Sequence, residues 1–341
     1  MTLKTIAVDV MGGDYGLDVT IQGALDFLQK QSDAALILVG DEARIKAALA
    51  QTKASLGRIT IQAASEVVGM DEEPSSALKN KRDSSMRVAI NQIKDGKAQA
   101  AVSAGNTGAL MATARFVLKT IPGINRPAIA KFLPARNNHV TLVLDLGANV
   151  DCSGEQLFQF AVAGSQLVAS LLTENNRPRV GLLNVGTEDI KGNAAVKEAH
   201  QLLRDSNLNF VGNVEGNAIF TAEVDVLVVD GFTGNAMLKS IEGAVKFSGE
   251  VIKEEFIRSW YNKLSALIAL PVFKGFKRRL DPRRFNGAIF LGLRGVVVKS
   301  HGGTDAAGFC FALEEAYKAI KADSITKIQA GVAEQLSSSE E

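Results

Sequence analysis

Seven short glycine-rich turns hold most of the residues whose types suit chemistry. Glycine lets backbone N–H groups approach an anion closely, and asparagine and threonine side chains add neutral donors. Helices that begin just after such turns add positive potential at their N-termini. The turns therefore predict a donor-rich crevice for an anion such as phosphate, although Gly-Asn pairs also serve as plain turns and caps. They are Met11–Asp14, Gly105–Gly108, Gly147–Asn149, Gly186–Asn193, Gly216–Asn217, Gly231–Asn235 and His301–Thr304.

Several charged residues lie in or beside these turns. Lys191, followed by Gly192 and Asn193, is placed to reach a phosphate or a carbonyl oxygen as a point charge, unless it is an ordinary solvated lysine. His301 precedes Gly302-Gly303, where it acts either on the same anion or as a structural cap. Asp9 and Asp14 bracket the first turn. The basic cluster Lys79, Lys81 and Arg82 stands before an expected helix start and is either an anion contact or a solvated face.

The motifs of several other enzyme classes are missing. The chain has no G-x-G, no GK[ST] ending, no G-x-S-x-G and no HExxH, which disfavours dinucleotide, P-loop, serine-elbow and zinc-protease chemistry. Three histidines without metal-ligand spacing predict no metal site. Two cysteines exclude a disulfide framework and suggest a reducing cytosol. A net charge of +1 argues against a general nucleic-acid binder. With no protein nucleophile evident, the nucleophile is expected to be the bound anion itself.

The elements that must position these turns alternate between strands and helices. Near-continuous apolar runs such as Val226–Val229 indicate strands buried on both faces, as in a parallel sheet. We expect one α/β domain over 1–341, a doubly wound, mostly parallel three-layer sheet whose turns all emerge at one carboxyl edge. Strands are predicted at 5–11, 34–40, 58–64, 100–104, 128–133, 140–146, 179–185, 209–214, 224–230 and 295–300. Helices are predicted at 19–30, 41–51, 84–95, 108–119, 156–172 and 194–204.

A helical hairpin is predicted as an insertion over 243–285, with its two helices separated near Pro271. Residues 246–284 contain ten Lys and Arg against four Asp and Glu, a net of +6, so the rest of the chain is −5. An apolar face beside basic residues is typical of contact with an anionic membrane surface. Packing in a dimer and docking of an acidic carrier protein remain open. The expected membrane-contact residues are Trp260, Leu264, Leu267 and Ile268.

Six motifs in consistent order, over about residues 4–320, resemble the acyl-ACP:phosphate acyltransferase (PlsX) family of bacterial phospholipid synthesis. They are 8–14, 103–109, 144–149, 184–193, 214–217 and 230–235, with Val10 where the family pattern has alanine. The resemblance implies a fold like those of phosphotransacetylase and isopropylmalate dehydrogenase, no cofactor, and a homodimer. It implies transfer of a long-chain acyl group from acyl carrier protein to inorganic phosphate. It also implies a place on the cytoplasmic face of the membrane, upstream of a membrane glycerol-3-phosphate acyltransferase.

Within that reaction, Lys191 is the catalytic candidate that the resemblance supplies. Asn193 and His301 are expected to assist it by donating to phosphate or to the oxyanion. Two other functions stay open: a phosphotransacetylase that uses acyl-CoA, and a non-catalytic scaffold that binds carrier protein at the membrane. The residues expected to bind phosphate or substrate are Asp9, Gly12, Gly13, Asp14, Arg82, Gly105, Asn106, Thr107, Asn149, Thr187, Asn217, Thr233 and Asn235.

Overall fold

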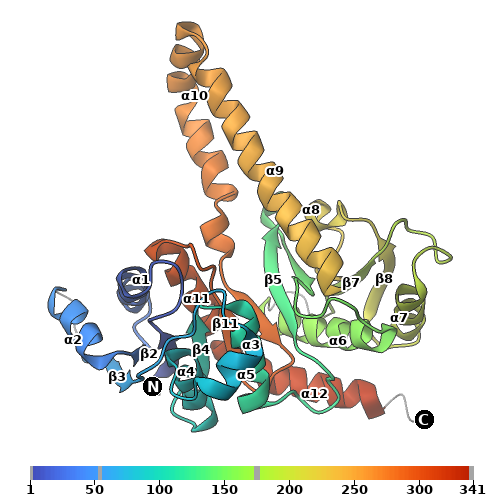
Figure 1. Cartoon of the computed structure of the whole chain (residues 1–341). Helices are drawn as coiled ribbons and strands as arrows, with labels where there is room; N and C mark the ends of the chain where they lie inside the picture. Colours follow the sequence, from blue (N-terminus) through green and yellow to red (C-terminus); the bar gives the residue numbers. More distant parts are fainter. Residues whose placement is uncertain (1–2, 53–55, 173–176, 338–341) are drawn as a thin grey trace.

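A single sheet of eleven strands runs through the molecule (Figure 1). The computed structural model describes residues 3–52, 56–172 and 177–337. The order across the sheet is β3-β2-β1-β4-β11-β10-β5-β6-β9-β7-β8. The strands are β1 (Lys4–Asp9), β2 (Ala34–Gly40), β3 (Ile59–Ala63), β4 (Ala100–Ser103), β5 (Ala128–Pro134), β6 (Val140–Leu144), β7 (Arg179–Leu183), β8 (Asn209–Val214), β9 (Val226–Val228), β10 (Ala288–Leu291) and β11 (Val296–Lys299).

The sheet is mostly parallel, but its two halves run in opposite directions. β10 is antiparallel to both β11 and β5, and β5 is antiparallel to β6. The strands β1, β4 and β11 therefore point one way, whereas β6, β9 and β7 point the other. The expectation that all the turns share one carboxyl edge is wrong for this reason. The turns fall into two groups, one on each half of the sheet.

Helices cover both faces of the sheet and complete the predicted three layers. Alternate strand residues feed two separate cores: Ile6 and Val8 pack on one face, and Ala7 packs on the other. The first face is covered by α1 (Leu17–Lys30), α2 (Glu42–Ala50), α6 (Gly154–Leu171), α7 (Ala194–Arg204), α11 (Ala306–Lys321) and α12 (Ser324–Ser337). The second is covered by α3 (Pro74–Asn80), α4 (Ser85–Lys94), α5 (Thr107–Leu118), α8 (Ala218–Thr221) and part of α9 (Gly231–Ile257).

All ten predicted strands and all six predicted helices are present, with ends shifted by a few residues. The four-residue strand β10 was not predicted; it runs antiparallel between β11 and β5, and the lasting change of direction comes at the antiparallel β5–β6 pair. β10 follows Asn286-Gly287 and is too short for a period to show. The short helix α8 was missed for the same reason, whereas the longer α11 and α12 were missed although their length allows a period to show.

The hairpin exists but differs from the prediction at two points. Its first helix, α9, begins at Gly231 rather than near 243, because Asp230 caps it through the backbone N–H of Thr233 at 2.8 Å. Its second helix, α10 (Trp260–Arg279), begins after Ser259, whose Oγ accepts from the Asn262 N–H at 3.1 Å. Pro271 lies inside α10 and does not separate the helices. The two helices project together from the body of the molecule (Figure 1).

An ion pair holds β7 against β9 in the C-terminal half. The Asp225 side chain is 2% exposed and accepts from the Arg179 backbone N–H at 2.7 Å and from its guanidinium at 3.1 and 3.0 Å. Burial alone would raise the pKa of Asp225, but the bonds from Arg179 and the charge of nearby His139 outweigh it, so the pKa lies below its usual value.

Replacing Asp225 with asparagine should therefore destabilise the fold in a pH-dependent way. Near pH 7 we expect a loss of about 1.5–3 kcal/mol in the free energy of unfolding, as for a hydrogen bond to a charged group. Because the folded-state pKa is lowered, this stabilisation is complete above the unfolded value of 3.8 and is lost as the pH falls through the folded value. Urea unfolding at several pH values measures it. An equal loss at pH 7 and at about pH 3 would contradict the assignment.

Candidate active site

Asp9, at the end of β1, supports the first glycine turn. Its carboxylate is 1% exposed and accepts from the Met11 backbone N–H at 3.2 Å and from Ser103 Oγ at 2.6 Å. Ser103 Oγ in turn accepts from the Gly105 N–H at 3.0 Å. A Cβ on Gly12 would stand 2.8 Å from the Gly105 nitrogen, so only glycine fits there. Asp9 thus ties two turns together from beneath.

Asp145, which follows β6, supports the glycine turn of the other half in the same way. It accepts from the backbone N–H groups of Ile129 at 2.9 Å, Ala148 at 3.0 Å and Asn149 at 2.7 Å. The Asn149 amide is buried and donates to Asp145 at 2.9 Å and to the Pro127 carbonyl at 2.9 Å. Burial raises the pKa of both Asp9 and Asp145. The predicted ligands Asp9 and Asn149 are therefore committed to internal bonds.

Other predicted donors also have internal partners. The Asn106 side chain caps α5 through the Ala109 N–H at 2.9 Å and donates to the carbonyls of Met70 and Glu72 at 2.8 and 3.0 Å. Asn193 caps α7 through the Val196 N–H at 2.9 Å. Thr107 opens α5, and Asn217 precedes α8. Thr233 and Asn235 lie in the first turns of α9, and their side chains are exposed. Within the described part of the chain, neither side chain caps a helix.

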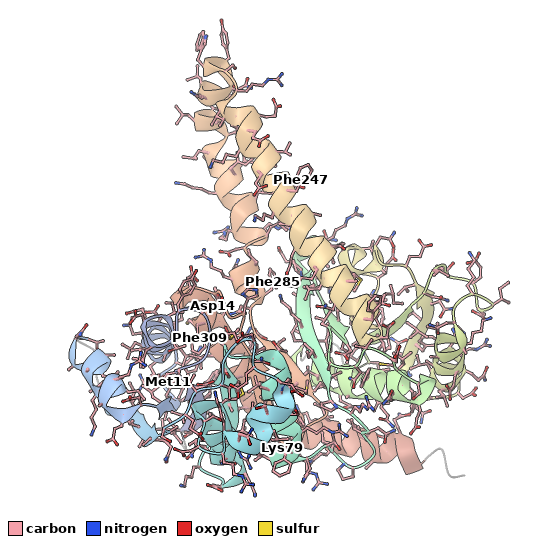
Figure 2. The ribbon with its side chains drawn as sticks, viewed as in Figure 1. Met11, Asp14, Lys79, Phe247, Phe285 and Phe309 are labelled. Atoms are coloured by element: carbon pink, nitrogen blue, oxygen red, sulfur yellow. The ribbon has the colours of Figure 1, made fainter. Side chains whose placement is uncertain are left out.

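Lys299 ends β11, beside the turns that Asp9 supports. Its ammonium donates to the Ala104 carbonyl at 3.2 Å and to the Ser300 carbonyl. Burial lowers the pKa of Lys299 to about 8, against the opposing charges of Asp14 and Asp9. Asp14 itself is exposed, with its N–H bonded to the Gly302 carbonyl at 3.0 Å. It lies at the side of the N-terminal half that faces the hairpin, whereas Lys79 lies at the far end (Figure 2).

His301 lies two residues after Lys299, and a hydrogen bond fixes its tautomer. Its Nδ1 accepts from the Gly303 N–H at 3.1 Å, so in the neutral ring the proton sits on Nε2. Burial, followed by the positive charges of Lys299, Lys239 and Lys131, lowers the pKa of His301. The imidazole is therefore a neutral donor near pH 7. Lys131 and Lys239 belong to the other half, and their charges act on His301 across the junction.

The opposing side is built by β5 and α9. Lys131 lies 3.9 Å from Glu242, which also pairs with Lys239 at 2.9 Å. Asn235, Lys239 and Glu242 are spaced by four and three residues, so they share one face of α9. A Cβ on Gly147 would touch Asn235 at 3.4 Å, which places the Asp145-supported turn beneath that face. We call the set Asp14, Lys131, Lys239, Glu242, Lys299 and His301 the charged junction.

Lys191 lies elsewhere, in the loop after β7. It is exposed and pairs with Glu188 at 2.8 Å. The loop is fixed by Asn184, which donates to the Lys191 carbonyl at 3.1 Å, and by Asn213, which donates to the Glu188 carbonyl at 3.2 Å. The loop extends from the β7–β8 edge of the sheet, away from β11 (Figure 1). Thr187 and Asn193 share this loop.

The structure thus brings some predicted residues together and separates others. Gly12, Gly13, Asp14, Gly105 and His301 gather on one side of the junction, with Asn235 on the opposite side. Arg82 is exposed near the distant cluster around Lys79. Sequence reasoning missed Lys131, Lys239, Glu242 and Lys299. A signal existed for two of them, because Lys131 and Lys299 are the charged residues within otherwise apolar strands.

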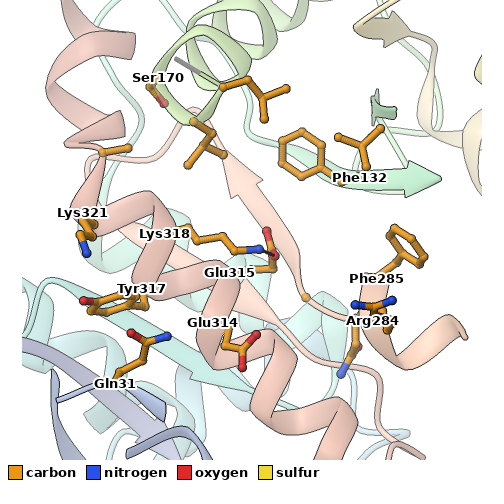
Figure 3. Close-up of a pocket in the computed structure, with 16 residues that line it drawn as sticks. Gln31, Phe132, Ser170, Arg284, Phe285, Glu314, Glu315, Tyr317, Lys318 and Lys321 are labelled. Atoms are coloured by element: carbon orange, nitrogen blue, oxygen red, sulfur yellow. Dashed lines mark hydrogen bonds and ion pairs between the residues drawn. The ribbon is translucent and has the colours of Figure 1, made fainter. Parts of the chain in front are cut away.

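A cavity of about 680 Å³ lies on the opposite face of the sheet (Figure 3). Phe132 lines it, and Phe132 points away from the side on which its neighbour Lys131 lies. Leu171, Leu172 and Phe285 add apolar surface, whereas α11 contributes Glu315 and Lys318. No predicted site residue lines this cavity. Within the described ranges there is no cluster of three or more metal-ligating side chains and no helix apolar and long enough to cross a bilayer.

Comparison with known proteins decides the family. The profile described as "Fatty acid synthesis protein" matches residues 4–327. A phosphate acyltransferase of Neisseria meningitidis serogroup A is 64% identical over 336 residues, covering 98% of this chain and 96% of the relative. The chain belongs to the phosphate acyltransferase family. That of Chromobacterium violaceum is 59% identical over 333 residues, covering 97% and 96%. Membership makes the chain an enzyme of the acyltransferase class.

Solved structures agree on the fold of this family member. A phosphotransacetylase of Streptococcus pyogenes aligns with a TM-score of 0.62 at 17% identity, covering 95% of this chain and 94% of the other. A branched-chain phosphotransacylase of Enterococcus faecalis aligns at 0.55 with 14% identity, covering 92% and 99%. The predicted phosphotransacetylase-like α/β fold is confirmed.

The pKa of His301 offers a direct check on the junction. In NMR titrations, one of the three histidines should titrate below the ordinary value of 6.5. Replacing Lys239 with methionine removes a repelling charge, so the pKa of His301 should rise. A titration that is unmoved by the substitution would show that α9 does not face His301.

Proposed function

We propose that the chain transfers a long-chain fatty acyl group from the thioester of acyl carrier protein to inorganic phosphate. The product is an acyl phosphate for phospholipid synthesis. Family membership at 64% identity over nearly the full chain is the observation that supports this most. The junction adds physical support, because a neutral imidazole donor stands among three ammonium groups there.

The chemistry needs little acid or base help. A phosphate oxygen attacks the thioester carbonyl, forming a C–O bond and a tetrahedral oxyanion, and the C–S bond then breaks. A thiol of pKa about 8.5 leaves readily as thiolate and takes its proton from water. Holding the partners in line and stabilising the oxyanion are the remaining tasks. His301 and Asn235 are placed to donate hydrogen bonds at the junction.

Lys191 is proposed as the charge that stabilises phosphate or the oxyanion, with Asn193 beside it. β7 and β9 pair in parallel, so the Lys191 loop leaves the strand end next to the one from which α9 starts. This proximity supports the proposal that Lys191 reaches the part of the site beside the N-terminus of α9. Its pairing with Glu188 means that Lys191 must exchange this exposed partner for substrate.

An assay with purified protein tests the reaction and Lys191 together. Long-chain acyl carrier protein should be consumed only when inorganic phosphate is present, with acyl phosphate as product. Lys191→Ala should lower kcat by about a hundredfold or more, the effect of losing one oxyanion donor. Its circular dichroism should match the wild type, since Lys191 is exposed.

Three results would contradict parts of this proposal. Absence of phosphate-dependent thioester loss would leave a non-catalytic scaffold for carrier protein. Faster turnover of acyl-CoA than of acyl carrier protein would favour a phosphotransacetylase, the activity named for the S. pyogenes protein of similar fold. Near-normal kcat in Lys191→Ala would reject that residue alone.

The hairpin is proposed to place the enzyme on the cytoplasmic face of the membrane as a peripheral protein. Trp260 and Tyr261 stack at its tip with ring centroids 3.6 Å apart, and both are exposed, at 65% and 63%. Leu264, Leu267 and Ile268 are also more than half exposed. Aromatic and aliphatic side chains next to basic residues suit the boundary of an anionic bilayer. There the product would pass to the membrane glycerol-3-phosphate acyltransferase.

We further propose a homodimer, with the exposed apolar side chains of α9 as its contact. Phe232 and Phe247 lie on this helix and are 68% and 66% exposed. Phe247 lies on the projecting part of α9 (Figure 2). The basic hairpin also suits an acidic carrier protein, and a dimer contact along α9 leaves the tip available for lipid.

Trp260 is the single tryptophan and reports on membrane contact. Adding phosphatidylglycerol vesicles should shift its emission to the blue, because the indole enters a less polar surrounding, and high salt should weaken the shift. Phosphatidylcholine vesicles serve as the uncharged control. Unchanged emission together with no co-sedimentation would count against the membrane proposal.

A further inference from the structure

Lys131 is a mostly buried ammonium group whose carboxylate partner is too far away for a hydrogen bond. Its side chain is 18% exposed, and burial lowers the pKa of Lys131. Its recorded partner within the described residues is Glu242 at 3.9 Å, beyond hydrogen-bond reach. Buried charges in proteins are normally paired and hydrogen-bonded, because desolvation is costly. An anion beside Lys131 would supply the missing acceptor.

The surroundings of Lys131 suit an anion that makes several hydrogen bonds. Lys239 is held by Glu242 at 2.9 Å and is 60% exposed, so the region is open to solvent. His301 presents its Nε2–H and lies within the electrostatic influence of Lys131, Lys239 and Lys299. Lys299 faces the carboxylates of Asp14 and Asp9, whereas Lys131 and Lys239 share Glu242 among the contacts of the described residues. The pair Lys131 and Lys239 therefore leaves a net positive charge for a bound anion.

We propose that inorganic phosphate binds among Lys131, Lys239 and His301, with Glu242 orienting the two lysines. The two ammonium groups attract the phosphate, and Nε2–H of His301 donates to one of its oxygens. This assignment rests on the proposed reaction and locates its acceptor subsite at the junction of the two halves, which leaves the oxyanion to Lys191. The low exposure of Lys131 favours a small free ion over a phosphodiester attached to the acyl donor.

Kinetics of the full-length enzyme separate these two sources of phosphate. Lys131→Met and Lys239→Met should each raise the KM for inorganic phosphate about tenfold or more, as expected for a lost charge-assisted hydrogen bond. The KM for the acyl donor should change little. Lys327→Met, on the exposed surface of α12, is the matched control and should behave as wild type. A rise confined to the KM of the acyl donor would overturn the proposal.

Binding without turnover gives a second readout. Adding inorganic phosphate to the wild type should raise the pKa of His301 in an NMR titration, because the anion offsets the nearby lysine charges. In Lys239→Met, which alters an exposed residue and should fold, phosphate should shift the pKa of His301 far less. Equal shifts in both proteins, or none in an active wild type, would reject this subsite. An inactive wild type that still shows the phosphate-induced shift would reject the proposed reaction and keep the subsite.

Discussion

Two buried carboxylates, Asp9 and Asp145, hold the glycine turns of the two halves in shape. Each ends a central strand and accepts backbone N–H groups from the glycine turn that follows. Asp9 also joins its turn to the end of β4 through Ser103, and Asp145 joins its turn to β5 through Ile129. Without these acceptors, several buried N–H groups would have no partner, at about 1–3 kcal/mol each. The turns owe their shape to this support.

The antiparallel pairing of β5 with β6 then determines where chemistry can occur. Because the sheet changes direction there, the turns of the two halves do not line a single edge. What the halves share is a junction. β11 and the turn after it contribute Lys299 and His301, and β5 and α9 contribute Lys131, Lys239 and Glu242. Burial and the like charges gathered there lower the pKa of His301, so its neutral ring can donate a hydrogen bond where an imidazolium would add another charge.

Much of the fold was predictable from local pattern. Continuous apolar runs predicted the strands, such as Ala34–Gly40, because burial on both faces leaves a plain signal. Strand direction has no such signal. The antiparallel pairing of two strands that were predicted, Ala128–Pro134 and Val140–Leu144, separated the turns into two groups. Pro271 misled the prediction because the cap at Ser259, and not the proline, sets where α10 begins.

The site was predictable only in part, for a related reason. Glycine and asparagine marked the turns correctly. The side-chain amides of Asn106 and Asn149, however, donate to backbone carbonyls of the protein, and the sequence alone does not reveal these bonds. Lysines that meet across the halves come from β5, α9 and β11, far apart in the chain. Only long-range pairing brings them together.

A crystal of the full chain soaked in inorganic phosphate tests the central claim most directly. The account predicts a bound anion in contact with Lys131, Lys239 and His301, between the two halves. Phosphate seated on the Lys191 loop, with the junction left to water, would contradict it.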